Sequence, residues 1–172
     1  MQLHIEVGDT SMDKEYLSTQ LAEALGIAHG IVEAEHKLLN DENLVFGMKR
    51  QLQEIHDEDE KHVKNLERAL DAVGRGDNIE KSIEHGRKVC HQLIEMSGDD
   101  PIEMVKATIL AKYRLADSQE LFYNICDVVG HTDICELFEE NLEEEEDHLD
   151  YLREQAMLMA HSRITGESIT NE

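Results

Sequence analysis

Proline, tryptophan and other aromatic residues are scarce in this sequence, and their scarcity narrows the fold class. The 172 residues include one proline, no tryptophan, three phenylalanines and four tyrosines. The Glu, Leu, Ala and Lys that abound instead lose little conformational freedom in a helix. A sheet protein of this length would show more β-branched runs and more turn residues. The composition therefore predicts an all-α protein.

Cysteine is also rare. The three cysteines, Cys90, Cys126 and Cys135, are odd in number, and no two of them have the C-x-x-C spacing of many zinc sites. We therefore expect small buried side chains at these positions rather than a disulfide framework or zinc ligands.

Basic residues are far outnumbered by acidic ones. Sixteen lysines and arginines stand against 39 aspartates and glutamates, which gives a formal net charge of -23. Such a charge repels the phosphates of nucleic acids and of anionic membranes, so neither is expected as a partner. A well-solvated surface accounts for the acidity, and attraction of metal cations toward an interior site is the alternative.

Long apolar runs are absent as well. No stretch approaches the ~20 apolar residues that span a bilayer, and the N-terminal segment MQLHIEVGDTSMDKE lacks the basic and apolar regions of a signal peptide. The length suits one core of ordinary size. The sequence thus predicts a single-domain, cytoplasmic protein.

Capping residues divide the chain into four long helices and one shorter helix. The shorter one is expected to begin at a capping box, Asp77 followed by Glu80, and to end near Gly98. Asp100 and Pro101 then supply an N-cap and a first-turn proline for the third long helix. The long helices are predicted at about residues 12–39, 44–73, 101–129 and 132–163.

The short turns between consecutive long helices predict two antiparallel hairpins. These hairpins cover about residues 12–73 and 101–163, with a connection at about 74–100 and a tail at 164–172. Apolar residues at helical spacing, including Ile79, Ile83 and Ile94, predict that the connection is partly helical. Two hairpins joined by one long crossover form a four-helix bundle.

Polar residues interrupt the apolar stripe of two helices with the same spacing. Asp59 and His62 lie on the inward stripe of the second long helix, and Glu145 and His148 lie on that of the fourth. Buried carboxylates are costly unless they are paired, protonated or bound to a metal. A carboxylate and a histidine at i and i+3 on two helices is the pattern of dinuclear carboxylate sites, which suit iron, manganese or zinc. One such motif often arises by chance in an acidic helix. Two motifs at corresponding places in the two hairpins favour a metal site, either one that this protein retains or one that its ancestor had.

Two segments resemble bacterioferritins. GHTDICELFEENLEEEEDHLDYLREQAML is similar to the family's fourth helix, and DEDEKHVKNLERAL is similar to its second, with Asp59 in place of the usual glutamate. The resemblance covers roughly residues 15–160 and is weakest in the first helix and the crossover. It implies a ferritin-like four-helix bundle in which Asp59, His62, Glu145 and His148 are four of six ferroxidase ligands. The implied cofactor is iron or manganese, as two ions, and the implied reaction is oxidation of Fe(II) by oxygen or peroxide.

The chain departs from the bacterioferritin pattern at the other two ligand positions. Lys112 stands where the family has its bridging glutamate. If the first turn lies near residue 42, Glu23 is level with Asp59, and it resembles the family's first-helix glutamate although it lies off the apolar stripe. Glu35 is better centred on that stripe but about eleven residues further along, or ~16 Å at the rise of an α-helix. Glu23 is therefore the predicted fifth ligand.

Three functions stay open at this point. The first is a bacterioferritin-like metal protein with a possible ferroxidase activity. The second is a ferritin-like bundle without metals, acting as a structural or interaction module, in which the Lys112 ammonium pairs with Asp59 and Glu145. The third is an oxygen carrier of the hemerythrin type, whose candidate iron ligands are His29, His36, His56 and His62. The simpler interpretation of these histidines is that they are exposed surface residues.

The resemblance also bears on haem and on assembly. Glu60 stands where the family has its haem-ligating methionine, so haem is not expected. The tail is too short for the fifth helix that the family's cages use. A homodimer through the first two long helices, or a higher homo-oligomer, is the predicted assembly.

Overall fold

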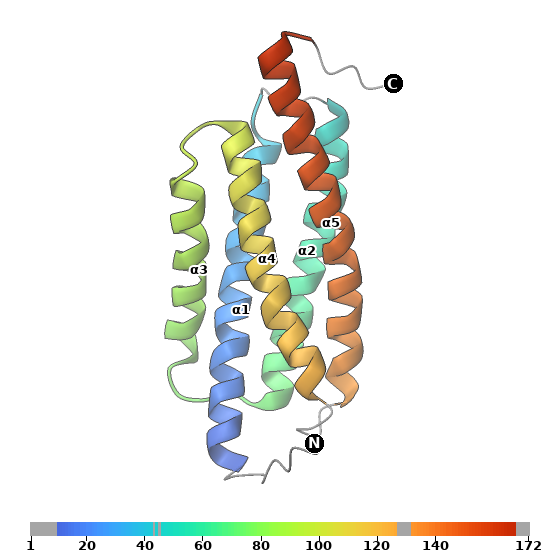
Figure 1. The fold of residues 1–172 in the computed structure, drawn as a ribbon. Coiled ribbons are helices and arrows are strands. Elements are labelled where there is room, and N and C mark those ends of the chain that lie inside the picture. Colours follow the sequence, from blue (N-terminus) through green and yellow to red (C-terminus); the bar gives the residue numbers. More distant parts are fainter. Residues whose placement is uncertain (1–9, 43, 45, 127–131, 168–172) are drawn as a thin grey trace, which may run out of the picture.

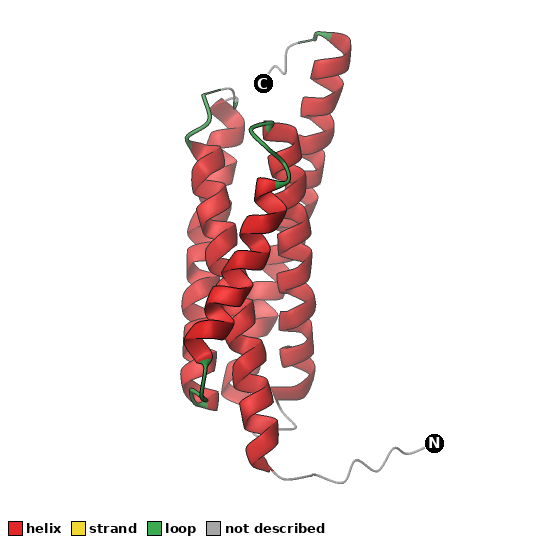
Figure 2. Ribbon diagram, turned by 90° about the vertical axis from the view of Figure 1, so that its left-hand side faces the viewer, coloured by secondary structure: helices red, strands yellow, loops and turns green. Residues whose placement is uncertain are grey.

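The computed structural model describes residues 10–42, 44, 46–126 and 132–167, and every regular element within these ranges is a helix (Figures 1 and 2). The prediction of an all-α protein is confirmed. Among the described residues, no helix combines the length and the apolarity that a membrane span requires. The helices are α1 (Thr10–Leu39), α2 (Phe46–Val73), α3 (Ile79–Glu95), α4 (Pro101–Cys126) and α5 (Thr132–Thr165).

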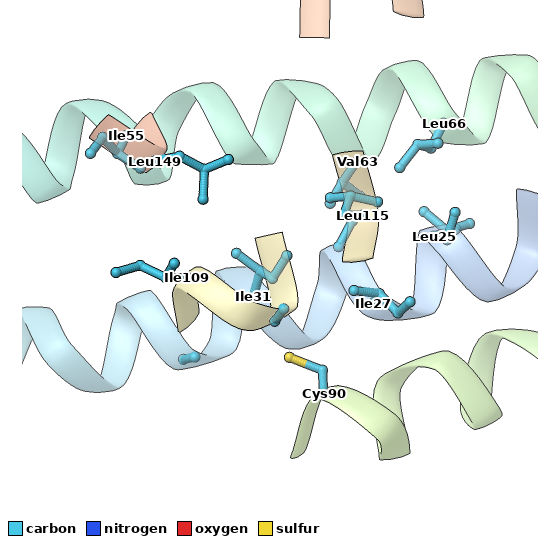
Figure 3. Packing of buried hydrophobic residues seen from close by; sticks show 14 of the residues in the cluster. Leu25, Ile27, Ile31, Ile55, Val63, Leu66, Cys90, Ile109, Leu115 and Leu149 are labelled. Carbon is cyan, nitrogen blue, oxygen red and sulfur yellow. The ribbon is translucent and has the colours of Figure 1, made fainter. Parts of the chain in front are cut away.

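The four long helices surround a common apolar core. α1 contacts α2 and α4, and α5 contacts α4 and α2, so that each long helix has two long neighbours (Figure 1). Leu25 from α1 lies close to Leu66 from α2, Ile31 from α1 lies close to Ile109 from α4, and all four are buried (Figure 3). Burial of each such side chain is worth ~1.5–3 kcal/mol. This core fixes the positions of the polar residues between the helices.

The connection between the two hairpins contains α3, which packs along α1 and also touches α4 (Figure 1). Glycines let the two backbones meet: a Cβ atom at Gly26 would lie 2.0 Å from the carbonyl oxygen of Ile83, and one at Gly86 would lie 2.0 Å from that of Glu23. The expectation that the connection is partly helical is confirmed. Its helix is held against α1 by backbone contact.

Replacing Gly86 by alanine should therefore destabilise the protein. The added methyl group must displace the α1 backbone, and overpacking of this kind costs about 1–3 kcal/mol. Thermal unfolding followed by circular dichroism measures the change. Lys88→Ala, at an exposed position of the same helix, is the control and should change stability by less than about 0.5 kcal/mol. Equal stability of the two variants would contradict the close contact of α1 with α3.

The start of α4 has the predicted cap, whereas the start of α3 does not. The backbone N–H of Ile102 donates to Asp100 Oδ1 at 3.0 Å, as an N-cap requires. Arg163, near the end of α5, donates to both carboxylate oxygens of Asp100, and these bonds lower the pKa of Asp100 to about 2. The capping box predicted at Asp77 is wrong. The N-cap of α3 is Asn78 in a left-handed conformation, without a side-chain cap.

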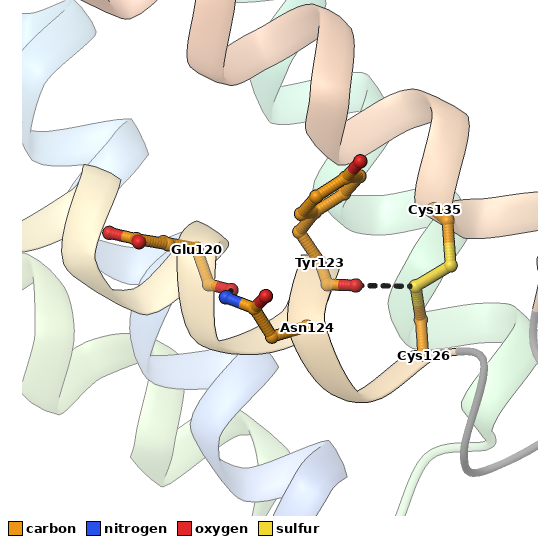
Figure 4. Close-up of a disulfide and its surroundings, with 5 residues drawn as sticks. All are labelled: Glu120, Tyr123, Asn124, Cys126 and Cys135. Atoms are coloured by element: carbon orange, nitrogen blue, oxygen red, sulfur yellow. Dashed lines mark hydrogen bonds between the residues drawn. A yellow bond between two sulfur atoms is a disulfide. The ribbon is translucent and has the colours of Figure 1, made fainter.

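Two of the three cysteines do not follow the expectation. Cys126, the last residue of α4, forms a disulfide with Cys135 near the start of α5, and their Cα atoms lie 5.9 Å apart (Figure 4). The Cys126 sulfur also lies 3.2 Å from the carbonyl oxygen of Tyr123. Cys90 is a free buried cysteine, as expected, and burial raises the pKa of its thiol to about 12. The predicted end of the third long helix at Val129 lies outside the described residues.

Candidate metal centre

The two carboxylate–histidine motifs meet in the middle of the core. Asp59 and His62 project from α2, Glu145 and His148 project from α5, and none of the four is more than 3% exposed. One ligand atom each from Asp59, His62 and Glu145 lies within 4.8 Å of the others. The stripes that the sequence predicts therefore bring these residues into one cluster.

Lys112 occupies one side of this cluster. Its side chain comes from α4, is completely buried, and donates to Asp59 Oδ2 and, at 3.2 Å, to Glu145 Oε2. His148 Nδ1 lies 3.3 Å from the same Nζ atom. Burial lowers the pKa of Lys112, but the charges of Asp59, Glu145 and Glu35 outweigh burial and raise it well above its usual value. Lys112 is thus an ammonium ion held between two carboxylates.

The other side of the cluster presents three donor atoms without hydrogen bonds. These are Asp59 Oδ1, Glu145 Oε1 and His62 Nδ1, and all three are buried. His62 Nδ1 lies 3.2 Å from Asp59 Oδ1 and 3.9 Å from Glu145 Oε1. Each carboxylate therefore turns one oxygen toward Lys112 and the other toward His62. Two carboxylate oxygens and an imidazole nitrogen are a suitable donor set for a divalent cation such as iron or manganese.

Two further glutamates orient the imidazoles. Glu144 Oε2, on α5, lies 2.7 Å from Nε2 of His62, and Glu58 Oε2, on α2, lies 2.6 Å from Nε2 of His148. Both contacts join α2 to α5. Carboxylates that bond the outer nitrogen of a histidine fix its tautomer and ring orientation. The inward stripes do not predict this pair, although each glutamate directly precedes a carboxylate of the cluster.

The cluster balances its own charge. Burial raises the pKa of Asp59, but the ammonium of Lys112 and the nearby histidines lower it more, so that its pKa lies well below the usual value. Burial lowers the pKa of His62, but its contacts with Asp59 and Glu145 raise it to about 9. The pKa of Glu35 is raised well above its usual value, by burial first and then by Asp59. At neutral pH Lys112 and His62 therefore supply the positive charge beside the buried carboxylates that they contact.

Glu23 lies outside this cluster, and Glu35 lies beside it. Arg114 donates to Glu23 Oε1 at 2.9 Å in a partly exposed pair. Glu35 is completely buried, and its Oε1 lies 3.5 Å from Nζ of Lys112. Glu35 Oε2 lies 3.5 Å from Nδ1 of His56. A first turn near residue 42 would make Glu23 level with Asp59. The contact of Glu35 with His56 instead moves the position level with Asp59 about eight residues toward the end of α1. Glu35 therefore lies within side-chain reach of Asp59.

The four histidines of the hemerythrin-like alternative do not converge. His36 is exposed, and its ring centre lies 6.2 Å from that of His56. His29 is partly buried, and burial lowers its pKa. Among the described residues, the three ligand atoms of Asp59, His62 and Glu145 are the one group that converges closely enough to hold a metal.

A groove between α4 and α5 leads from the surface toward the cluster. Its volume is about 530 Å³, and its lining includes Asp117, Glu120, Asp150 and the buried Glu145. The guanidinium carbon of Arg153 lies 4.9 Å from the ring centre of Tyr113 in the same groove. Acidic side chains along such a groove raise the local concentration of cations.

Comparison of the chain with protein-family models, with curated proteins and with solved structures gave no match. The resemblance to bacterioferritin therefore stays a prediction.

Proposed function

We propose that this chain is a ferritin-like four-helix bundle, related to bacterioferritin, that binds one divalent iron or manganese ion. The observation that carries this proposal is the group of three buried donor atoms, on Asp59, His62 and Glu145, that make no hydrogen bond. The three atoms face one another, with His62 Nδ1 3.2 Å from Asp59 Oδ1 and 3.9 Å from Glu145 Oε1, and a cation that replaced the proton of His62 would be held by all three. Oxidation of Fe(II) by oxygen or peroxide is the chemistry that iron supplies in such a centre.

One ion rather than two follows from the position of Lys112. The ammonium contacts both carboxylates on the side where a second ion of a dinuclear centre would need them. Metals in dinuclear centres lie about 4 Å apart. The ammonium of Lys112 already lies on that side and takes up one oxygen of each carboxylate. A second ion therefore does not bind while Lys112 holds its place.

A ferritin-like bundle without metal, acting as a structural or interaction module, is the second candidate. The observation that favours it is the charge balance of the cluster, in which Lys112 and His62 already compensate the two carboxylates. A homodimer or higher homo-oligomer and a cytoplasmic location stay predictions of the sequence in either case.

Titration of the metal-free protein with Mn(II) tests the proposal. We expect one bound ion per chain, measured by calorimetry and by the electron paramagnetic resonance signal of free Mn(II). His62→Ala removes one of the three donors and should weaken binding on the order of 100-fold or more. His85→Ala, at an exposed position of α3, is the matched control and should leave binding unchanged.

Other stoichiometries discriminate between the candidates. Two ions per chain would show an intact dinuclear centre of the bacterioferritin type. An absence of binding in the natural protein, with the fold intact, would favour the metal-free module. Equal binding by both histidine variants would place the ion elsewhere and contradict the proposed ligands.

A further inference from the structure

The proposed ligands are buried, so a divalent cation needs a path to them from the surface. Asp59, His62 and Glu145 are each no more than 3% exposed. Of these three residues, Glu145 also lines the groove between α4 and α5, and its Oε1 atom makes no hydrogen bond. The groove thus connects the surface with a ligand that has a carboxylate oxygen available for a cation.

Other faces of the molecule are less suitable for entry. Between α2 and α5, carboxylates bond the outer nitrogens of His62 and His148. On the same face the ammonium of Lys61 donates to Glu140 at 2.6 Å and to Glu144 at 3.3 Å. A second groove, beside the end of α1, is lined by two cationic side chains and by no proposed ligand. These faces are closed by side-chain bonds or carry positive charge.

The walls of the groove between α4 and α5 attract cations. Asp117 and Glu120 project from α4, Glu146 and Asp150 project from α5, and all four side chains are exposed. Acidic side chains that face one another across a groove raise the local concentration of divalent cations and the rate at which they associate. The surface charge therefore directs cations to the face on which Glu145 lies.

Arg153 opposes this attraction. It is the one basic residue among the described residues that line the groove. Its guanidinium donates to Asp150 Oδ1 at 2.8 Å, and the guanidinium carbon lies 4.9 Å from the ring centre of Tyr113. A cation that enters must pass this positive charge, which also occupies one of the carboxylates on the wall.

We propose that divalent cations reach the metal site through the groove between α4 and α5, and that Arg153 limits the rate at which they pass. The inference rests on the proposed function and assigns roles to residues that are not ligands. Asp117 and Asp150 attract the passing cation, and Arg153 repels it. Because these residues act on the passing ion and not on the bound one, they change the association and dissociation rates by the same factor. The dissociation constant stays the same.

Rate measurements with Mn(II) test this inference. Calorimetry gives the dissociation constant, and stopped-flow mixing of the loaded protein with an excess of a fluorescent chelator gives the dissociation rate. The association rate is the ratio of the dissociation rate to the dissociation constant. Arg153→Gln should raise both rates about threefold, and Asp117→Asn should lower both about threefold. The dissociation constant should change less than about twofold in either variant.

The surface pair of Arg75 with Asp71 provides matched controls. Arg75 Nε donates to Asp71 Oδ1 at 2.9 Å at the end of α2, much as Arg153 donates to Asp150. Arg75→Gln and Asp71→Asn make the same changes of net charge and should leave both rates unchanged. In about 0.5 M salt, the effects of the groove variants should largely disappear, because salt screens exposed charges. Circular dichroism of each variant checks folding.

Three results would overturn the inference without affecting the proposed function, provided that the natural protein binds one ion. Unchanged rates in both groove variants would show that cations enter elsewhere. Equal rate changes in the control variants would show an effect of net charge alone. A change in the dissociation constant that accounts for the change in one rate would show that the groove residues act on the bound ion. An absence of Mn(II) binding in the natural protein would overturn the proposed function, and this inference with it.

Discussion

Lys112→Glu should convert the centre into a site for two metal ions and make the fold depend on them. The substitution places a carboxylate where the resemblance to bacterioferritins predicts a bridging glutamate, and it removes the ammonium that Asp59 and Glu145 share. Breaking a buried ion pair from one side costs on the order of 3–5 kcal/mol. Without metal, the variant should therefore unfold well below the natural protein in temperature. With Mn(II), each filled site should return about 2.7 kcal/mol when free metal is at ~100 times its dissociation constant.

Lys112→Met separates the two effects of that substitution. Methionine removes the charge and adds no ligand, so the metal-free variant should also lose stability but should still bind a single ion. Thermal unfolding with and without Mn(II), combined with metal analysis, gives both quantities. The account is contradicted if the glutamate variant binds no more metal than the methionine variant, or if either variant without metal is as stable as the natural protein.

The metal-free protein should lose roughly 2–3 kcal/mol of stability as the pH rises from 7 to 9.5. His62 is the cause, because its contacts with Asp59 and Glu145 overcome the effect of burial and raise its pKa to about 9. A group with a raised pKa in the folded state contributes stability that is complete below its unfolded pKa. That contribution is lost as the pH passes through the folded pKa. Urea unfolding at a series of pH values measures the dependence.

Metal should reverse the direction of this effect. The proposed site uses Nδ1 of His62 without its proton, so Mn(II) should bind more tightly, and stabilise the protein more, as the pH rises. His62→Gln is the control and should remove most of the dependence in the metal-free protein. A pH-independent stability of the natural protein between pH 7 and 9.5 would show that His62 is not held as an imidazolium.

The helices and the inward-facing polar residues could be predicted from the sequence because both depend on local pattern. Asp100 and Pro101 identify the start of α4, and the structure has the corresponding N–H bond to Asp100. The stripes of α2 and α5 predict that Asp59 and Glu145 both face the core, and the metal-free alternative predicts that Lys112 pairs with them. Their side chains meet in the core. Periodicity alone decides which residues of a long helix face inward.

The choice between Glu23 and Glu35 depends on axial register, which local pattern does not fix. α2 begins at Phe46, later than predicted, and the connection that begins at Asn40 shifts α1 relative to α2. A shift of a few residues is enough to exchange one acidic side chain for another. The apolar stripe of α1 does favour Glu35, so the pattern of that helix was a better guide than the assumed turn.

Side-chain contacts between different helices also could not be predicted from the sequence. The buried side-chain amides of Asn65, Asn141 and Gln119 form a hydrogen-bonded chain, with distances of 2.8 and 2.7 Å, across α2, α5 and α4. The disulfide of Cys126 with Cys135 depends in the same way on where two helix ends lie, and a spacing of nine residues does not indicate it. Such pairs follow from the packing of whole helices.

Anomalous diffraction from crystals of the natural protein grown with Mn(II) tests the central claim most directly. We predict a single manganese peak bounded by Asp59, His62 and Glu145, with the ammonium of Lys112 still in the core between Asp59 and Glu145. Two peaks in the core about 4 Å apart, with Lys112 turned toward solvent, would contradict the account and restore a dinuclear centre.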